Sequence, residues 1–197
     1  MITKDREYRS FEMKAADESE YTVEGYAAVV NTPTVLFTDG DKEYKEQIAP
    51  DAFREADMRD VVLNFDHEGK PVARTKNNTL DLAVDERGLK IKAYLGGTEE
   101  GRRLYEEVKG GYLDKMSFAF TVSEDTYSDN YTMRTIDKVK RVYDVAIVTF
   151  PAYAATEVSA RNTFNAEAEK AKIAEARREQ IERIKKLTER NTDNGNA

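Results

Sequence analysis

The sequence contains no cysteine and no tryptophan, and it has a single histidine, His67. The absence of cysteine excludes disulfide bonds and thiolate metal sites. A metal site around the single imidazole would need carboxylates, but Asp66 and Glu68 flank His67 and would not share its face on a strand. We therefore expect neither a metal nor another cofactor.

Long apolar runs are also missing. No stretch approaches the roughly 20 residues that a membrane helix needs, and the first residues, MITKDREYRS, lack the apolar region of a signal peptide. The net charge of −7 argues against a strong general attraction to nucleic acid. These absences favour a cytoplasmic protein that binds neither membranes nor nucleic acid.

What is present suits a folded domain with an appendage. The chain has 197 residues, of which 40% are apolar and 35% are charged. The length allows one ordinary domain plus a further segment, or one large domain. The apolar fraction allows a hydrophobic core, and the charged fraction predicts a heavily charged surface or a solvated segment.

Alternating and β-branched residues dominate the first two thirds of the chain. They predict strands, separated by turn signals such as NTPT and DERG. A short helix is expected to begin at Pro50-Asp51 and to run through residue 56. The expected strands are residues 21–31, residues 61–67 ahead of a Gly-Lys-Pro turn, a hairpin over 79–95, residues 115–125, and one or two strands within 131–153.

Two segments predict longer helices. Residues 99–109 follow Thr98, a suitable N-cap, and precede a Gly-Gly pair that ends the helix. Residues 165–190 are rich in Ala, Glu, Lys and Arg, without Gly or Pro, and carry only a sparse stripe of isoleucine and leucine. This second helix is interpreted as a solvated tail or as a partner-docking helix, and residues 191–197 are expected to be disordered.

Three polar residues in predicted strands are candidates for chemistry. Ser117 lies in KMSFAF, where Met116 and Phe118 are expected to face the core, so that the serine would point to the opposite face and could be exposed in a groove. His67 ends an apolar strand, and Asp144 lies among apolar residues that share its strand face. Each has an ordinary alternative: a structural strand serine, a hydrogen-bonded histidine, and an acid paired with Arg or Lys.

Together the three residues match the division of labour in nucleophilic acyl transfer. A serine hydroxyl needs a base to take its proton, and the base needs a third group that fixes its tautomer. There is no G-x-S-x-G motif, so an α/β-hydrolase is not supported. Composition and spacing alone indicate only a β-rich domain with a helical tail.

Ordered local motifs add a resemblance. They are VEGYAAVVNT, EQIAPDAF, LNFDH followed by PVARTKNNTLDLAVDERGLKIKAYL, KMSFAF, and DVAIVTFPAY. In this order they resemble the tailed-phage (caudovirus) prohead maturation protease family, which is related in fold to the herpesvirus assemblins. The resemblance covers about residues 6–160, and it departs from the family at Ala73, where relatives often carry glycine before the arginine.

The resemblance implies an α+β fold, a small closed or nearly closed β-barrel flanked by helices, with the helical tail outside it. It places the nucleophile on Ser117 and the base on His67. Herpesvirus relatives use a second histidine as the third member, so a carboxylate must serve here. Asp144 is the first choice, and the rivals are Glu68, Asp66 and Asp114.

The function implied by this resemblance is that of a serine endopeptidase inside the immature capsid, in the host cytoplasm. Its substrates would be the scaffold or a scaffold-like segment of the major capsid protein, and also the protease itself. Residues 1–164 would form the prohead serine protease domain, ahead of the 165–190 tail. Two alternatives remain: a non-catalytic capsid-assembly protein on the same fold, and an unrelated β-barrel binding module.

Overall fold

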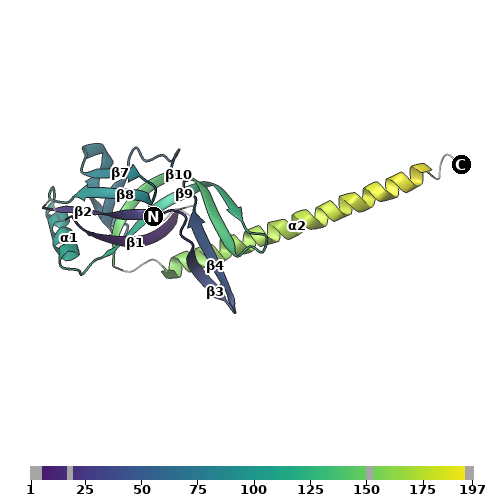
Figure 1. Cartoon of the computed structure of the whole chain (residues 1–197), viewed down its shortest axis with the longest axis horizontal. Helices are drawn as coiled ribbons and strands as arrows, with labels where there is room; N and C mark the ends of the chain where they lie inside the picture. The colour runs from purple at the N-terminus through teal and green to yellow at the C-terminus, as the bar shows by residue number, and fades with distance from the viewer. Residues whose placement is uncertain (1–5, 17–19, 150–152, 194–197) are drawn as a thin grey trace. The chain divides into compact units, whose positions relative to one another are not determined.

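The structure is a computed structural model that describes residues 6–16, 20–149 and 153–193. The chain divides into two compact units, Met1–Glu157 and Val158–Ala197. Figure 1 shows that the first unit holds the strands and the helix α1. The strands are β1 (Glu7–Ala15), β2 (Thr22–Val29), β3 (Thr34–Asp39), β4 (Lys42–Ile48), β5 (Val62–Phe65), β6 (Glu68–Arg74), β7 (Leu80–Val84), β8 (Gly88–Tyr94), β9 (Lys115–Tyr127) and β10 (Met133–Val148). The helices are the 3-10 turn η1 (Thr75–Asn77), α1 (Glu99–Lys109) and α2 (Tyr153–Asp193).

The ten strands form one mixed, mostly antiparallel sheet, which gives the chain an α+β fold. Its order is β3-β4-β10-β9-β1-β2-β8-β7, and β5 pairs with β10 on one side and with β6 on the other. The long strand β10 pairs in parallel with β4 near its start and with β5 near its end. β4 and β5 therefore pair with the same edge of β10, one near its start and the other near its end.

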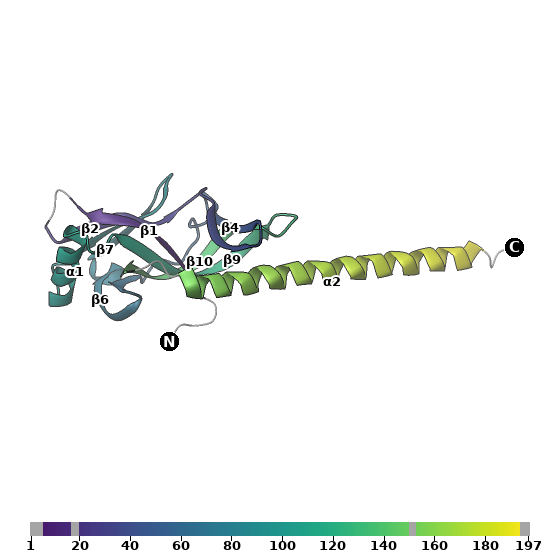
Figure 2. The same ribbon diagram turned by 90° about the horizontal axis from the view of Figure 1, so that it is seen from below.

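The sheet is open, which corrects the expected closed or nearly closed barrel. Within the described residues no hydrogen-bonded ladder joins the terminal strands β3 and β7, and β6 pairs only with β5. Closure would require the short β5–β6 hairpin to continue the ladder to β7, and no such pairing is formed. The sheet curves around its core, but its two ends stay unpaired (Figure 2).

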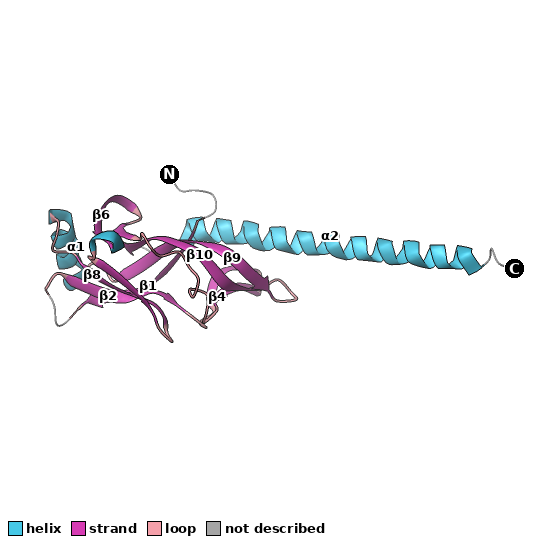
Figure 3. Ribbon diagram, turned by 90° about the horizontal axis from the view of Figure 1, so that it is seen from above, coloured by secondary structure: helices cyan, strands magenta, loops and turns pink. Residues whose placement is uncertain are grey.

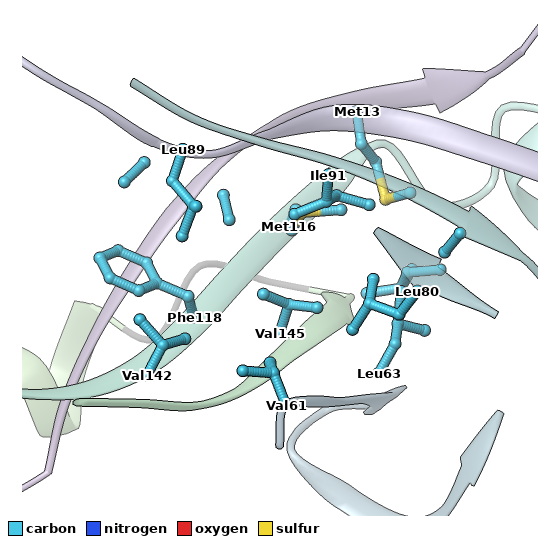
Figure 4. Packing of buried hydrophobic residues seen from close by; sticks show 14 of the residues in the cluster. Met13, Val61, Leu63, Leu80, Leu89, Ile91, Met116, Phe118, Val142 and Val145 are labelled. Carbon is cyan, nitrogen blue, oxygen red and sulfur yellow. The ribbon is translucent and has the colours of Figure 1, made fainter. Parts of the chain in front are cut away.

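The core lies on one face of the sheet. Met116, Phe118 and Phe120 of β9 are fully buried there, as the alternation in KMSFAF predicted, and Val145 of β10 and Leu63 of β5 join the same cluster. Figure 4 shows Met116, Phe118, Val145 and Leu63 converging with side chains of β1 and β8, among them Met13, Leu89 and Ile91. The opposite face of β9 therefore carries Ser117, which is not a member of this cluster.

Elements with strong local signals form as predicted. Helix α1 spans Glu99–Lys109, and the hydroxyl of its N-cap Thr98 accepts a hydrogen bond from Gly101 N at 2.9 Å. Residues 79–95 form the β7–β8 hairpin. Gly88 ends its turn with a φ of 147°, and a Cβ there would lie 2.1 Å from the carbonyl oxygen of Ala28. Only glycine fits this close approach of two strands.

The short helix expected over residues 51–56 is wrong. This segment is a series of turns, in which Ala52, Arg54 and Ala56 each donate a backbone hydrogen bond to the residue three positions earlier. No bond to the fourth residue back follows, so the turns do not extend into an α-helix. The side chain of Phe53 is instead buried in the core, and its packing favours the compact turns.

Charged residues are buried on the sheet between β1, β4 and β10. Glu46 is 3% exposed and accepts hydrogen bonds from Arg9 Nε at 2.6 Å and Arg134 Nη1 at 2.9 Å. Glu7 accepts from both arginines, and Asp125 accepts from Arg134. Each charge is thus matched by opposite charge, as burial requires.

The same network predicts acid sensitivity. Burial raises the pKa of Glu7, but hydrogen bonds and positive charge from Arg134 and Arg9 outweigh it and hold that pKa below its usual value. A lowered pKa in the folded state stabilises the fold above the unfolded pKa of about 4.3, and this stability is lost as pH falls through the folded pKa. We therefore expect Glu7→Gln to be less stable than the parent at pH 7, with the gap shrinking at acid pH.

Urea unfolding of Glu7→Gln and the parent at several pH values between 7 and 3 measures that gap. The matched control is Glu86→Gln, which removes an exposed carboxylate in the β7–β8 turn. A gap between parent and Glu7→Gln that is independent of pH would contradict the prediction.

Helix α2 is a continuous helix from Tyr153 to Asp193 (Figure 3). The helix predicted for residues 165–190 lies within it, and the structure begins the helix earlier. Its isoleucines are exposed: Ile173 by 50%, Ile181 by 53% and Ile184 by 62%. None of the described helices is both long and apolar enough to cross a membrane. Residues 191–197 were expected to be disordered. Of these, 191–193 belong to helix α2, and 194–197 lie outside the described ranges.

Candidate active site

His67 lies in the two-residue turn of the β5–β6 hairpin. Phe65 pairs with Glu68 across this turn, and Asp66 and His67 both have positive φ, at 47° and 59°. Two positive φ angles in a two-residue loop are the signature of a type I′ turn, and Asp and His tolerate this conformation better than most residues. The prediction that His67 continues the strand ahead of a Gly-Lys-Pro turn is therefore wrong, because the chain reverses at His67 itself.

The side chain of Asp66 ties this turn to the end of β10. Its carboxylate accepts hydrogen bonds from Thr149 N at 3.0 Å and from Thr149 Oγ1 at 3.2 Å. Its backbone N–H donates to Ile147 O at 2.9 Å. Asp66 therefore fixes the hairpin that carries His67 against the strand that carries Asp144.

We expect Asp66→Ala to lower the rate of any reaction that depends on His67 by roughly 10- to 100-fold, because alanine loses both Thr149 contacts and disfavours positive φ. Asp66→Asn keeps an acceptor and tolerates the turn, so it should retain most of the activity. The rate of substrate cleavage by the parent and both variants, with urea unfolding in parallel, makes the comparison. Equal rates for the three proteins would show that the anchor is dispensable.

His67 and Asp144 come together although 77 residues separate them in sequence. His67 Nδ1 lies 2.5 Å from Asp144 Oδ1, and the two side chains are 15% and 10% exposed. A carboxylate can only accept, so Nδ1 carries the proton and the bond fixes the tautomer in which Nε2 is the basic nitrogen.

The rival carboxylates have other positions. Asp66 binds Thr149, as described above, and Asp114 lies 3.6 Å from the ammonium of Lys115. Glu68 is exposed on β6. Of the four acids considered in the sequence, Asp144 is therefore the one that the structure gives a hydrogen bond to His67.

Ser117 occupies β9 on the same face of the sheet as Asp144. Ser117 pairs with Ala146, and Asp144 pairs with Ala119, so Ser117 and Asp144 are diagonal neighbours across β9 and β10. Such neighbours have Cα atoms about 7–8 Å apart. That spacing leaves room for one imidazole ring between a hydroxyl and a carboxylate, and the ring of His67 is held at the Asp144 end of it.

Ser117 is buried, with 1% of its surface exposed, and its hydroxyl has no hydrogen-bond partner among the described residues. The expectation that it lies exposed in a groove is thus wrong. β9 is an interior strand flanked by β1 and β10. A buried hydroxyl without a partner is unusual in proteins and calls for an explanation.

The sequence did not predict the structural role of two residues of this region. One is Asp66, which was considered only as a rival to Asp144 and whose role as an anchor depends on a contact with Thr149 that no local pattern reveals. The other is Asn64, which is 8% exposed and whose amide oxygen also has no hydrogen-bond partner in the described part of the chain. An asparagine inside the apolar run VVLNF was the available signal, because a buried amide needs a reason.

A surface hollow lies beside the β5–β6 hairpin, with a volume of about 480 Å³. Its walls combine apolar and charged side chains from the hairpin and from α1. They include Phe65, Val72 and Leu104, together with Glu68, Lys70, Glu100, Arg103 and Glu107. Ser117 and Asp144 are not among the residues that line it, so the hollow and the serine are separate features.

The described residues contain no group of three His, Asp or Glu side chains arranged to hold a metal ion. The arrangement of His67, Asp144 and Ser117 supports proton transfer by an oriented imidazole, which is the chemistry of acyl transfer by a serine.

Two known proteins are similar to this chain. The prohead protease of Enterobacteria phage HK97 is 30% identical over 156 residues, which cover 77% of this chain and 65% of that protein. The chain therefore spans about two thirds of the length of that relative. The capsid assembly protease of bacteriophage T4 matches with a TM-score of 0.45 and 11% identity, over 73% of this chain and 97% of that one.

A sequence profile adds the decisive match. The profile described as caudovirus prohead serine protease matches residues 9–171, a span that contains β2 to β10 and the three candidate residues. The chain accordingly belongs to the caudovirus prohead serine protease family.

Proposed function

We propose that this protein is a serine endopeptidase of phage capsid maturation. The observation that carries the proposal is the hydrogen bond between His67 and Asp144 on the sheet face that also bears Ser117, in a chain of this family. In it Ser117 is the nucleophile, His67 the general base and Asp144 the residue that orients the base.

The proposed reaction has two halves. Ser117 Oγ attacks the carbonyl carbon of the scissile peptide bond while His67 Nε2 takes the hydroxyl proton. Collapse of the tetrahedral intermediate breaks the C–N bond, and His67 gives its proton to the departing amine. Water then repeats the sequence on the acyl-enzyme, which releases the new carboxyl end and restores Ser117. Asp144 stabilises the imidazolium in both halves.

The substrates proposed are the scaffold, or a scaffold-like segment of the major capsid protein, and the protease itself. Cleavage would take place inside the prohead, in the host cytoplasm. The protease domain would be residues 1–164, and the charged helix over 165–190 would serve as a tail. The exposed isoleucines of that helix give it an apolar surface suited to contact with scaffold or capsid protein.

The burial of Ser117 has a mechanistic consequence. A peptide reaches a side chain that is 1% exposed only after its surroundings rearrange. An enzyme in this state is catalytically inactive, as a protease that must not act before the prohead has assembled should be.

The same burial is the observation that favours a second candidate, a non-catalytic assembly protein on the same fold. A serine-directed phosphonate separates the two. Covalent labelling of Ser117 supports the enzyme, whereas inertness of the assembled protein favours the assembly role.

The direct test is co-expression with the neighbouring capsid protein, read by intact-mass spectrometry. One sample carries the parent chain and the other carries Ser117→Ala. Capsid protein shortened only by the parent establishes the protease and locates its cleavage site. Identical masses in both samples, with proheads formed in both, would overturn the proposal.

A further inference from the structure

Two buried hydrogen-bond donors lie just before β1 and on β9, and the proposed triad uses neither. They are Arg6 Nε and Thr121 Oγ1, which have no hydrogen-bond partner among the described residues. The Nε atom of an arginine can only donate, so it calls for an acceptor, and a threonine hydroxyl can donate as well. Buried donors without a partner are unusual in proteins. The pair therefore indicates a ligand that brings acceptor atoms.

The sheet register places both residues on the face that carries Ser117. Thr121 follows Ser117 by four residues on β9, and alternate residues of a strand share a face. Glu7, the first residue of β1, pairs with the residue before Thr121, so Arg6 lies level with Thr121. Thr121 also pairs with Arg141 of β10. Arg6, Thr121 and Arg141 therefore form one row across three neighbouring segments.

The ring of Tyr143 joins the two arginines of this row. Arg6 Cζ lies 3.9 Å from the centroid of the ring, and Arg141 Cζ lies 4.9 Å from it. Cation–π contacts of this kind hold a guanidinium group in place. Tyr143 lies at a register shift of β10, between Val142 and Asp144, and such bulges often re-aim side chains beside active sites. The residue next to Asp144 thus positions two guanidinium groups.

Carboxylates near the row leave most of its positive charge without a counterion. Within the described residues no carboxylate forms an ion pair with Arg6. The carboxylate beside Arg141 is that of Asp57, at 4.0 Å, and Arg59 already binds Asp57 with two hydrogen bonds of 2.9 and 3.0 Å. The whole chain has a net charge of −7. A row of arginines on such a protein favours an anionic ligand.

We propose that Arg6, Thr121 and Arg141 bind a carboxylate side chain, of Asp or Glu, in the peptide that Ser117 cleaves. This inference rests on the proposed function and specifies its substrate. The four residues from Ser117 to Thr121 span roughly 13 Å, which an extended peptide covers with about four residues. The acidic residue would therefore lie about four residues from the cleaved bond. Guanidinium donors match the two oxygens of a carboxylate.

The burial of the two donor atoms corresponds to the burial of Ser117. All three atoms lie on one face of the sheet, and each lacks a partner among the described residues. The rearrangement that exposes Ser117 to a peptide would open this face, and with it Arg6 Nε and Thr121 Oγ1. The carboxylate subsite would thus become available together with the nucleophile.

The rival explanation is structural, in which the two arginines only stack on Tyr143. The explanations differ in how the loss of an arginine depends on the charge of the substrate. A carboxylate subsite matters only for a substrate that carries the carboxylate. A structural role affects every substrate equally and lowers the melting temperature of the protease.

The experiment extends the co-expression test of the proposed function. The cleavage site found there identifies the acidic residue, and a second capsid protein carries Gln or Asn in its place. Each capsid protein is expressed with the full-length parent, Arg6→Gln or Arg141→Gln. The matched control is Lys140→Gln, which removes the same charge from an exposed residue next to Arg141. Intact mass follows the rate of cleavage, with melting temperatures and fluorophosphonate labelling of Ser117 measured in parallel.

We expect each arginine variant to cleave the acidic capsid protein about 10- to 100-fold more slowly than the parent, as for the loss of a hydrogen bond to a charged group. The parent should cleave the neutral capsid protein slowly, and the arginine variants should cleave it no more slowly than the parent does. Labelling should change little, because the probe is too small to span the distance from Ser117 to Thr121. Lys140→Gln should match the parent throughout.

Several results would overturn the inference. One is a cleavage site without Asp or Glu within about four residues on either side. Others are an equal loss on both capsid proteins, cleavage of the acidic one at the parent rate, slower labelling, or a lowered melting temperature. Should Arg6→Gln fail to fold, Arg141→Gln decides the question, and failure of both marks the arginines as structural. If the parent leaves the capsid protein uncut, the proposed function fails, and the subsite with it.

Discussion

Replacing Ser117 by alanine should abolish cleavage of the co-expressed capsid protein and leave the fold intact. The expected loss is about 10⁶-fold, the usual effect of removing a serine nucleophile. The reason is that alanine removes the proposed nucleophilic hydroxyl, which is diagonal to Asp144 across β9 and β10. Stability should be retained, because the Ser117 hydroxyl has no partner among the described residues.

The matched control is Ser123→Ala. Ser123 lies on the same strand, is exposed, and donates a hydrogen bond to Lys138 O at 3.2 Å. The Ser123→Ala variant should therefore cleave the capsid protein like the parent. His67→Asn should be as inactive as Ser117→Ala, and asparagine is preferred to alanine there because His67 has a φ of 59°. Cleavage by folded Ser117→Ala would show that another residue is the nucleophile.

Asp144→Asn should lower the rate of cleavage by about 10⁴-fold, less than the loss of the nucleophile. The carboxylate fixes the proton of His67 on Nδ1, and an amide that turns its NH₂ group toward that nitrogen favours the opposite tautomer. His67 then presents a protonated Nε2, which cannot accept the serine proton. The rate of fluorophosphonate labelling of Ser117 reports this loss without the need for a protein substrate.

The control for this variant is Asp137→Asn, which removes a carboxylate from the same strand β10 away from His67. The parent and Asp137→Asn should label at the same rate. Full reactivity of Asp144→Asn would pass the orienting role to another acid or to water, and would leave the short contact with His67 as a purely structural one.

Local patterns predicted part of this fold. Helix α1 was located to the residue because its N-cap, its acidic first turn and its glycine stop all lie within its own sequence. The strands β1 and β4 were not assigned, because they bury Arg9 and Glu46, and buried charge breaks the alternation by which strands are identified. The buried charges of these strands are stabilised by the ion network, which joins residues far apart in the chain.

The candidate site likewise combines features that the sequence predicts with features that depend on contacts between distant residues. The face of Ser117 followed from alternation, but its burial depends on the strands at either side. The pairing of His67 with Asp144 requires the parallel ladder between β5 and β10, and no spacing in the sequence encodes that ladder. The turn at Asp66-His67 was missed because it contains no glycine, although two residues that tolerate positive φ stand side by side there.

The position of β10 in the sheet also determines when the candidate site can form during synthesis of the chain. β10 separates β9 from β5, and it is the last strand among the described residues. On a ribosome, Ser117 and His67 are therefore made well before the strand that aligns them, and Asp144 arrives with that strand. The nascent chain cannot bring Ser117, His67 and Asp144 together until β10 has left the exit tunnel, so the proposed active site would be unable to act during translation.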